Sequence, residues 1–232
     1  RQRIKKNHTA THLLHAALKK TLGDHVHQAG SLVHPDYLRF DLTHSEKIST
    51  NEVLEIERLV NDEIQKNVGL DISIKDFDVA KAEGAEALFG EKYGDEVRVI
   101  SISDFSMELC GGTHVNRTGD IGLLKVIEES SLAAGVRRLV AVTGPEAINY
   151  VQKNANIVYE LQGVLGTKAD EISSRVNHLI DERKELEKKL KQKRSSSQFN
   201  ARALMDESVK VNDYNILVSE IESESLDELK GF

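Results

Sequence analysis

The sequence changes character at Gly144–Pro145, and this change limits the folds that the 232-residue chain can adopt. Before it, helical and strand-like patterns interleave without a regular strand–helix–strand repeat, which is typical of an α+β fold. After it, the residues up to about 194 are nearly all helix formers, and Pro145 stands where proline favours a helix start. We therefore predict an α+β domain over residues 1–144, followed by a long helical segment.

Hydrophobic spacing predicts the elements of this first domain. Helices are expected over residues 7–22, with Asn7 as the N-cap, after the Ser49–Glu52 capping box, and over residues 78–89. Strand patterns occupy residues 37–42, 70–74, 96–103, 121–128 and 136–142. Together they predict two layers, in which helices pack against a mixed or antiparallel sheet.

The later residues form two further predicted segments. A linker over 145–197 carries an apolar heptad seam, broken by Gly163 and Gly166 and ended by three serines; the seam residues are Ile172, Val176, Leu179, Leu186 and Leu190, with Arg183 in the remaining slot. The seam favours a helical hairpin or a short coiled coil, and the alternative is an amphipathic helix packed on its own domain. Residues 198–232, with a strand at 214–218 and a helix from Ser225, read as the truncated start of a small α/β domain.

Composition excludes several protein classes. The single cysteine excludes an intramolecular disulfide and the zinc fingers that need several cysteines. No run approaches the ~18 apolar residues of a membrane helix, and no apolar core follows the basic N-terminus, so no signal peptide is expected. The missing initial Met suggests an excised fragment. The net charge is −7, yet residues 1–20 hold six Lys and Arg and no acid, so a nucleic-acid partner is not excluded.

Two short clusters carry metal-binding side chains. His8 and His12 lie one turn apart on the first predicted helix, and Cys110 and His114 flank a turn with two glycines. Each pair alone is more often ordinary packing or surface, but the two pairs together form a plausible tetrahedral zinc set of three nitrogens and one sulfur. Thr9 replaces the general-base Glu of the zinc-protease motif, so peptide hydrolysis by that route is not expected. Cys110 as a nucleophile lacks an evident third orienting residue.

At these residues the sequence resembles the editing domain of alanyl-tRNA synthetases. The resemblance is dense over residues 1–144, and its segments are Asn7–Leu18, Gln28–Ser31, Leu38–Asp41, Ala87–Gly94, Glu108–Val115, Thr118–Gly122 and Gly135–Arg138. Threonyl-tRNA synthetase editing domains are similar only in the spacing of the His and Cys residues. The helical stretch and the tail resemble the linker and the start of the C-terminal domain of the same synthetases.

The resemblance implies hydrolysis of serine or glycine wrongly esterified to tRNA(Ala), in support of accurate protein biosynthesis in the cytoplasm. A pocket for alanine cannot strongly exclude smaller glycine and rejects one added hydroxyl only weakly, so a second, hydrolytic site is needed. The ATP-dependent ligase core that joins alanine to tRNA is not expected in these residues. The implied partners are the mischarged tRNA and the rest of the synthetase chain, and the C-terminal region offers a surface for dimerisation.

The resemblance also implies site residues. His8, His12, Cys110 and His114 match the ligands of one Zn²⁺, while Thr11, Gln28 and Arg137 match positions that sense serine, read a hydroxyl or water, and face the tRNA end. The alternatives are a Thr11 hydroxyl bonded to its own helix and plain surface roles for the other two. Because four ligands close a tetrahedral zinc, we expect three firm ligands and a labile His8, since helix starts fray.

Two other functions stay open at this point. The chain resembles, over its editing segments, free-standing aminoacyl-tRNA editing proteins. It can also be an RNA-binding and dimerisation module with a structural zinc, which contacts RNA through residues 1–20 and the basic stretch 183–194.

Overall fold

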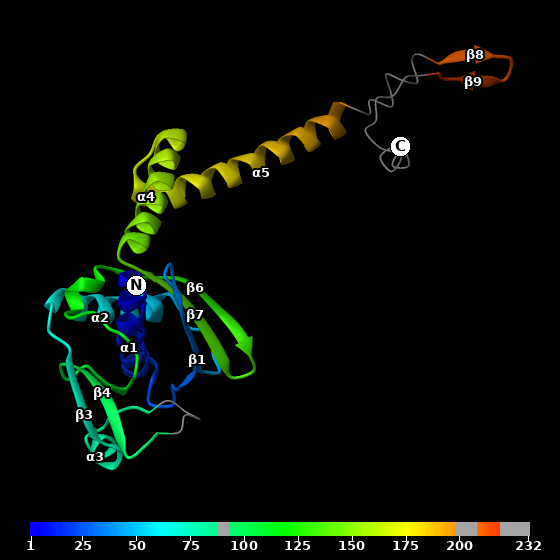
Figure 1. Ribbon diagram of the computed structural model, residues 1–232. Coiled ribbons are helices and arrows are strands. Elements are labelled where there is room, and N and C mark those ends of the chain that lie inside the picture. The colour runs from blue at the N-terminus through cyan, green and yellow to red at the C-terminus, as the bar shows by residue number, and fades with distance from the viewer. Residues whose placement is uncertain (88–92, 198–207, 219–232) are drawn as a thin grey trace. The chain divides into compact units, whose positions relative to one another are not determined.

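The computed structural model describes residues 1–87, 93–197 and 208–218, with side chains left out of account at 193–197. The chain divides into two compact units, Arg1–Ile157 and the residues from Val158 onward. The first unit holds all the predicted site residues and is an α+β assembly with antiparallel sheets, which confirms the predicted fold class (Figure 1).

Helix α1, Gln2–Leu22, runs through the middle of the first unit with strands on either side (Figure 1). It begins five residues before the predicted start, and Asn7 is therefore not its N-cap. The Asn7 side chain is instead buried, donates to the carbonyl of His34 at 2.6 Å and accepts from the hydroxyl of Thr143 at 2.6 Å. Its amide bonds to distant residues rather than to the first turn, which is why the local capping rule misplaced the helix start.

A four-stranded antiparallel sheet with the order β1-β2-β7-β6 packs on one side of α1. Its strands are β1 (Gln28–Val33), β2 (Leu38–Thr43), β6 (Leu124–Ala133) and β7 (Val136–Thr143). The predicted strands at 37–42 and 136–142 are thus present, whereas β1 was not predicted. Strand β6 begins later than the predicted residue 121 because a 3₁₀ turn, η1 (Thr118–Ile121), precedes it.

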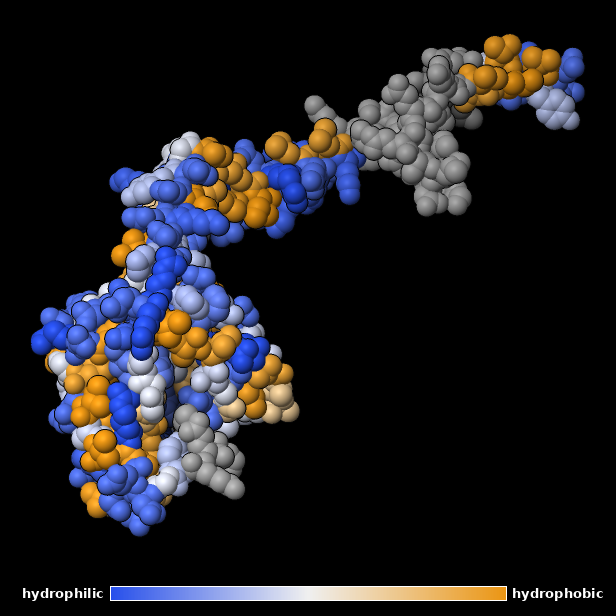
Figure 2. All heavy atoms as spheres, in the orientation of Figure 1, coloured by the Kyte–Doolittle hydropathy of each residue, from blue (hydrophilic) through white to orange (hydrophobic). Residues whose placement is uncertain are grey.

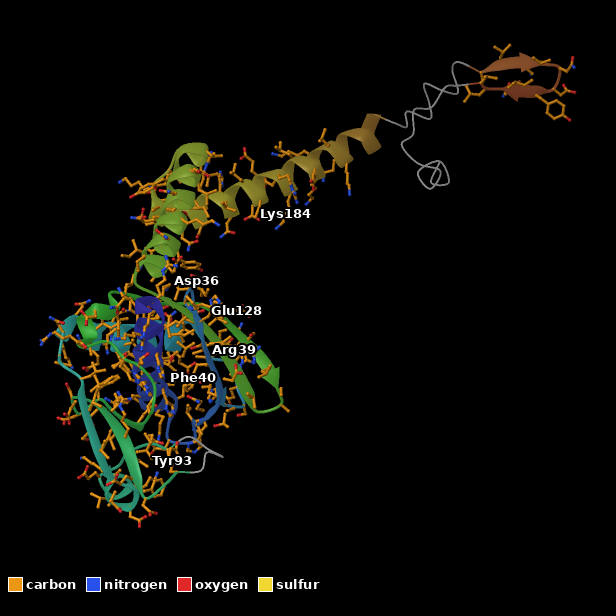
Figure 3. All side chains as sticks on the ribbon, viewed as in Figure 1. Asp36, Arg39, Phe40, Tyr93, Glu128 and Lys184 are labelled. Carbon is orange, nitrogen blue, oxygen red and sulfur yellow. The ribbon has the colours of Figure 1, made fainter. Side chains whose placement is uncertain are left out.

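The main core lies between this sheet and the helices. Alternate residues of β2 point inward and are completely buried, namely Leu38, Phe40 and Leu42 (Phe40 is labelled in Figure 3). They meet buried leucines of α1, and α2 (Thr50–Lys66) completes the cluster after the predicted capping box at Ser49. This burial fixes the rotation of α1 about its own axis.

A three-stranded antiparallel sheet lies on the other side of α1. It consists of β3 (Asp71–Asp76), β4 (Glu96–Ile102) and β5 (Ser106–Leu109), in that order. Helix α3, Phe77–Ala82, is shorter than the predicted helix over 78–89 because the chain turns at Gly84 with φ 95°. The end of that prediction, and most of the Ala87–Gly94 segment, lie outside the described residues.

The helical segment contains α4 (Pro145–Leu165), the 3₁₀ turn η2 (Ala169–Glu171) and α5 (Ile172–Ser197). Pro145 begins α4 as predicted, and the chain leaves α4 at Gly166, where φ is 61°. The three serines that end the predicted linker form the last residues of α5, which ends at Ser197. Residues 208–218 contain the hairpin β8 (Val209–Val211) and β9 (Tyr214–Ile216), while the predicted helix from Ser225 lies outside the described residues.

Apolar side chains of the predicted seam lie at the surface of α5 (Figure 2). Leu186 is 54% exposed and Leu190 is 61% exposed. The domain boundaries at 144 and 197 stay predictions. The division between the two compact units falls within α4, after Ile157. Within the described part of the chain, no helix is both long enough and apolar enough to cross a membrane.

The burial of Asn7 gives a first testable prediction. Replacing Asn7 with Ala leaves the hydroxyl of Thr143 and the carbonyl of His34 without their partner, so we expect the free energy of unfolding to fall by about 1–3 kcal/mol. The exposed Asn51 of α2 is the matched control, and Asn51→Ala is expected to change stability by less than about 0.5 kcal/mol. Urea unfolding monitored by circular dichroism measures both. Equal stabilities of the two variants would contradict the structural role of Asn7.

Candidate metal centre

The structure brings together the four side chains that the two sequence clusters supply. His8 and His12 come from successive turns of α1, and Cys110 and His114 come from the loop that follows β5. The four candidate ligand atoms all lie within 4.8 Å of one another. The ring centroids of His8 and His114 are 4.3 Å apart, and those of His12 and His114 are 4.9 Å apart. Tertiary folding therefore converts two pairs, about a hundred residues apart, into one group.

The loop that carries Cys110 is held by Arg98 of β4. The backbone N–H of Cys110 donates to the carbonyl of Arg98 at 3.0 Å, which extends the pairing of β4 with β5 by one residue. In return, the Arg98 guanidinium donates to the carbonyls of Cys110 and Gly112 at 2.8 and 2.7 Å. These bonds fix the turn and, with it, the direction in which the Cys110 sulfur points.

Gly112 allows the closest approach in the group. A Cβ atom at Gly112 would lie 2.0 Å from Cε1 of the His8 ring, whereas a Cβ at Gly111 would meet nothing within 4 Å. The two neighbouring glycines therefore differ in function. Gly112 leaves room for the imidazole of His8, and Gly111 does not contact the group.

Partners on the outer ring nitrogens orient two of the histidines. His12 Nδ1 bonds to the carboxylate of Glu108, and His114 Nδ1 lies 3.2 Å from the hydroxyl of Thr9. Among the described residues, the buried Nε2 atoms of His12 and His114 have no hydrogen-bond partner. Buried nitrogens without partners are unfavourable, and an ion or a water accounts for them. His15 Nε2 is also buried without a partner among the described residues, but only the Nε2 atoms of His12 and His114 lie beside the Cys110 sulfur and His8. The donor set thus fits a bound cation.

The charges of the group also suit a cation. Burial alone raises the pKa of the Cys110 thiol, but the three imidazole rings around the sulfur outweigh burial and lower the pKa to about 3, so the thiolate dominates. Burial lowers the pKa of His114, which keeps that ring neutral. A thiolate and neutral imidazoles are the forms that bind Zn²⁺.

His12 and Glu108 form a coupled buried pair. Burial alone lowers the pKa of His12, yet the facing carboxylate raises it to about 10. Burial alone raises the pKa of Glu108, yet His12 and His15 lower it to about 2. Glu108 is therefore ionised, and His12 must release a proton before its Nε2 binds a cation.

Three residues predicted from the resemblance lie in other surroundings. Thr11 is buried, and its hydroxyl donates to the carbonyl of Asn7 at 2.8 Å, the bond to its own helix that was the alternative reading. Gln28 is half-buried in β1 opposite Leu42, and Leu42 in turn pairs with Arg137 of β7. The Arg137 guanidinium pairs with Glu129, its Nε donating at 2.7 Å.

In the described part of the chain, no hydrogen bond or ion pair joins these three side chains to the four candidate ligands. Their functional roles stay predictions.

Sequence reasoning missed several residues that support the group. Glu108, Thr9 and Arg98 contact the candidate ligands or their loop directly. His15 reaches the same carboxylate as His12, with its Nδ1 3.0 Å from Glu108. One signal was available, because His8, His12 and His15 share one stripe of a helix. The sequence did not show that this histidine stripe of α1 packs against β5, the strand that carries Glu108.

A cavity of about 420 Å³ borders the group at His114 and is also lined by Lys5, Arg98 and neighbouring residues. Another cavity, of about 390 Å³, contains none of the four candidate ligands and is lined by His15, Glu108, Lys19 and Phe105, among others. Both fall in the size range of small-molecule sites.

The contrast between Gly111 and Gly112 gives a second prediction. Gly112→Ala forces the His8 ring away from the other ligands, so we expect the affinity for Zn²⁺ to fall at least about tenfold, as it does when ligand orientation is disturbed. Gly111→Ala adds the same methyl group in open space and is expected to bind Zn²⁺ as the unchanged chain does. Competition with a chromophoric chelator measures both affinities. An unchanged affinity in Gly112→Ala would show that His8 is not a ligand.

Part of the chain that carries these residues matches a known domain family. Residues 97–140 match the domain described as the threonyl and alanyl tRNA synthetase second additional domain, and this range runs from β4 to β7 and includes Cys110 and His114.

Similarity to individual proteins extends well beyond residues 97–140. Alanine–tRNA ligase of Pseudoalteromonas translucida is 48% identical over 232 residues, which is 100% of this chain and 27% of that protein. The Lactobacillus johnsonii enzyme is 44% identical over 99% of this chain and 26% of its own length. The Thermotoga maritima enzyme is 49% identical over 91% of this chain and 24% of its own length. Along its whole length, the chain is therefore a relative of alanine–tRNA ligases and spans about a quarter of the length of those proteins.

Proposed function

We propose that residues 1–144 form the editing domain of an alanyl-tRNA synthetase, which uses Zn²⁺ to hydrolyse serine or glycine wrongly esterified to tRNA(Ala). The observation that carries this proposal is the group of His8, His12, Cys110 and His114, with two buried ring nitrogens that lack a partner among the described residues. The similarity to alanine–tRNA ligases supports the choice of substrate. Alanine is a difficult amino acid to select by size, so hydrolysis of errors is chemically required.

Some residues would bind the Zn²⁺ ion, and others orient the residues that bind it. The four candidate ligands would hold Zn²⁺, which supplies a Lewis acid for the ester carbonyl or a water of lowered pKa. Glu108 and Thr9 orient His12 and His114 from behind. Arg98 keeps the Cys110 turn in place, so the sulfur stays directed at the same point as the ring nitrogens.

His8 is the ligand that we propose to be labile. The original reason, fraying at the helix start, is wrong, because α1 begins at Gln2 and His8 lies within the helix. A different reason supports the same choice. His8 is only half-buried, its Nε2 lies 3.4 Å from the Cys110 sulfur, and among the described residues its Nδ1 has no partner like those of His12 and His114. Movement of this ring would open a coordination position for substrate or water.

The surroundings of His114 suit the tRNA end. The cavity that His114 lines also contains Lys5 and Arg98, whose positive charges attract phosphodiesters. Arg3 is less available, since it pairs with Asp36 at 2.9 Å and with Glu146 at 3.2 Å. We therefore propose that the 3′ end of the tRNA enters beside Lys5.

The other segments receive roles in the same proposal. Residues 145–197 serve as a helical linker, and residues 198–232 begin the C-terminal domain of the synthetase. The exposed seam on α5 offers a surface for dimerisation or for the rest of the synthetase chain. Joining alanine to tRNA with ATP, in the cytoplasm, would belong to the longer enzyme rather than to these residues.

A structural zinc in an RNA-binding module is the second candidate. One observation favours it: four protein ligands close a tetrahedral site, and closed sites are typical of structural zinc. Under this alternative, the chain binds tRNA and does not deacylate it.

Single-turnover deacylation of seryl-tRNA(Ala) by the 232-residue chain separates the two candidates. We expect Cys110→Ala to lose bound Zn²⁺, measured by elemental analysis of the same sample, and to lower the deacylation rate at least about a hundredfold, since the sulfur ligand is removed. Lys184→Ala, on the exposed surface of α5, is the control and should match the unchanged chain (Figure 3). A zinc-free variant with full activity would contradict the metal-dependent site. Tight tRNA binding by the unchanged chain without deacylation would favour the structural alternative.

A further inference from the structure

We propose that Glu108 is a positioning residue for the metal centre: held from the far side by His15, it fixes the His12 ring with Nε2 facing the cation. The inference rests on the metal site of the proposed function and assigns a role to two residues outside the ligand set. The hydrogen bonds, the burial and the strand that carries Glu108 each support it.

The two oxygens of Glu108 are divided between two rings. Oε2 bonds to His12 Nδ1, and Oε1 lies 3.0 Å from His15 Nδ1. All three side chains are at most 7% exposed. An ionised carboxylate can only accept hydrogen bonds, so both Nδ1 atoms must carry their protons. For His12, this leaves the Nε2 lone pair for the cation.

His15 explains how the carboxylate tolerates its burial. A buried carboxylate with a single hydrogen-bonding partner is costly, because each of its two oxygens needs a donor. His15 supplies a second donor from the next turn of α1, and its ring packs on Phe40 with centroids 5.3 Å apart. The second histidine therefore holds Glu108 in the position that His12 requires.

Strand pairing of the backbone sets the position of Glu108 along α1. Glu108 pairs with Ile100 across β4, and Glu86 forms an isolated bridge to it on the other side. Residues two apart along an extended strand point to the same face, so Glu108 and Cys110 both point toward α1. One strand end thus supplies a ligand and the residue that orients another ligand.

The other histidines are held less firmly. The hydroxyl of Thr9 can either donate to or accept from His114 Nδ1, so it does not select a tautomer. Among the described residues, the hydrogen-bonding contact of His8 is with the Cys110 sulfur, and its ring otherwise lies against the rings of His12 and His114. Among the residues outside the ligand set, Glu108 is therefore the one whose removal we expect to affect metal binding most.

The test compares Zn²⁺ affinity in matched variants of the whole chain, by chelator competition. Glu108→Gln keeps the shape but offers an N–H to one of the two rings, and we expect Zn²⁺ affinity to fall about 10- to 100-fold. Glu57 of α2 is the control, since its buried carboxylate accepts from the Val126 N–H and from Lys125, each at 2.7 Å. Glu57→Gln should lower the melting temperature and leave the affinity unchanged.

Two further measurements keep the inference falsifiable if Glu108→Gln folds poorly. His15→Phe keeps an aromatic ring at this position and removes the N–H, and we expect a smaller loss of Zn²⁺ affinity than in Glu108→Gln. The visible spectrum of the Co²⁺-loaded protein should also change in both variants, because the ligand geometry changes, and should stay the same in Glu57→Gln.

The outcomes separate this inference from the proposed function. An unchanged chain that binds no Zn²⁺ overturns both. An unchanged chain that binds Zn²⁺ and deacylates, while Glu108→Gln or His15→Phe keeps full affinity and the original Co²⁺ spectrum, overturns only the role of Glu108 and His15.

Discussion

The burial of α1 on both sides is the constraint on which the rest of the first unit depends. One face carries leucines that pack on the four-stranded sheet, and the opposite face meets β5 and the loop after it. Polar side chains on a helix in this position need partners, because their transfer from water without one is unfavourable. Thr9 and His12 of the second face find such partners in distant parts of the chain, whereas the Nε2 atom of His12 has none among the described residues.

The polar face of α1 meets this requirement through long-range contacts. Thr9 accepts from the N–H of Val115 at 3.2 Å, and His12 bonds to Glu108. These contacts hold the loop of Cys110 and His114 against the helix. The same face thus stabilises the fold and gathers the nitrogen and sulfur atoms of the candidate metal site, so fold and chemistry share one set of interactions.

Local patterns predicted the elements where local energetics decide. The capping box at Ser49 and the helix start at Pro145 are both present, and the apolar residues predicted on one side of β2 are buried, although Asp41 between two of them is buried as well. One prediction failed because distant partners decide. Asn7 is a good local cap, but its amide is used between the helix and the sheet. The helix predicted over 78–89 failed for a local reason, since the chain turns at Gly84 with a positive φ.

The sequence by itself determined the fold class and the four metal-binding residue types, since both depend on periodicity and on short spacings. It could not determine which residues form hydrogen bonds with these metal-binding side chains and orient them. Glu108 and His15 are 93 residues apart, and only the pairing of α1 with β5 brings them into contact. The tertiary structure decided which ring nitrogens are held and which are left for a cation, because hydrogen bonds between distant segments exist only after the core has packed.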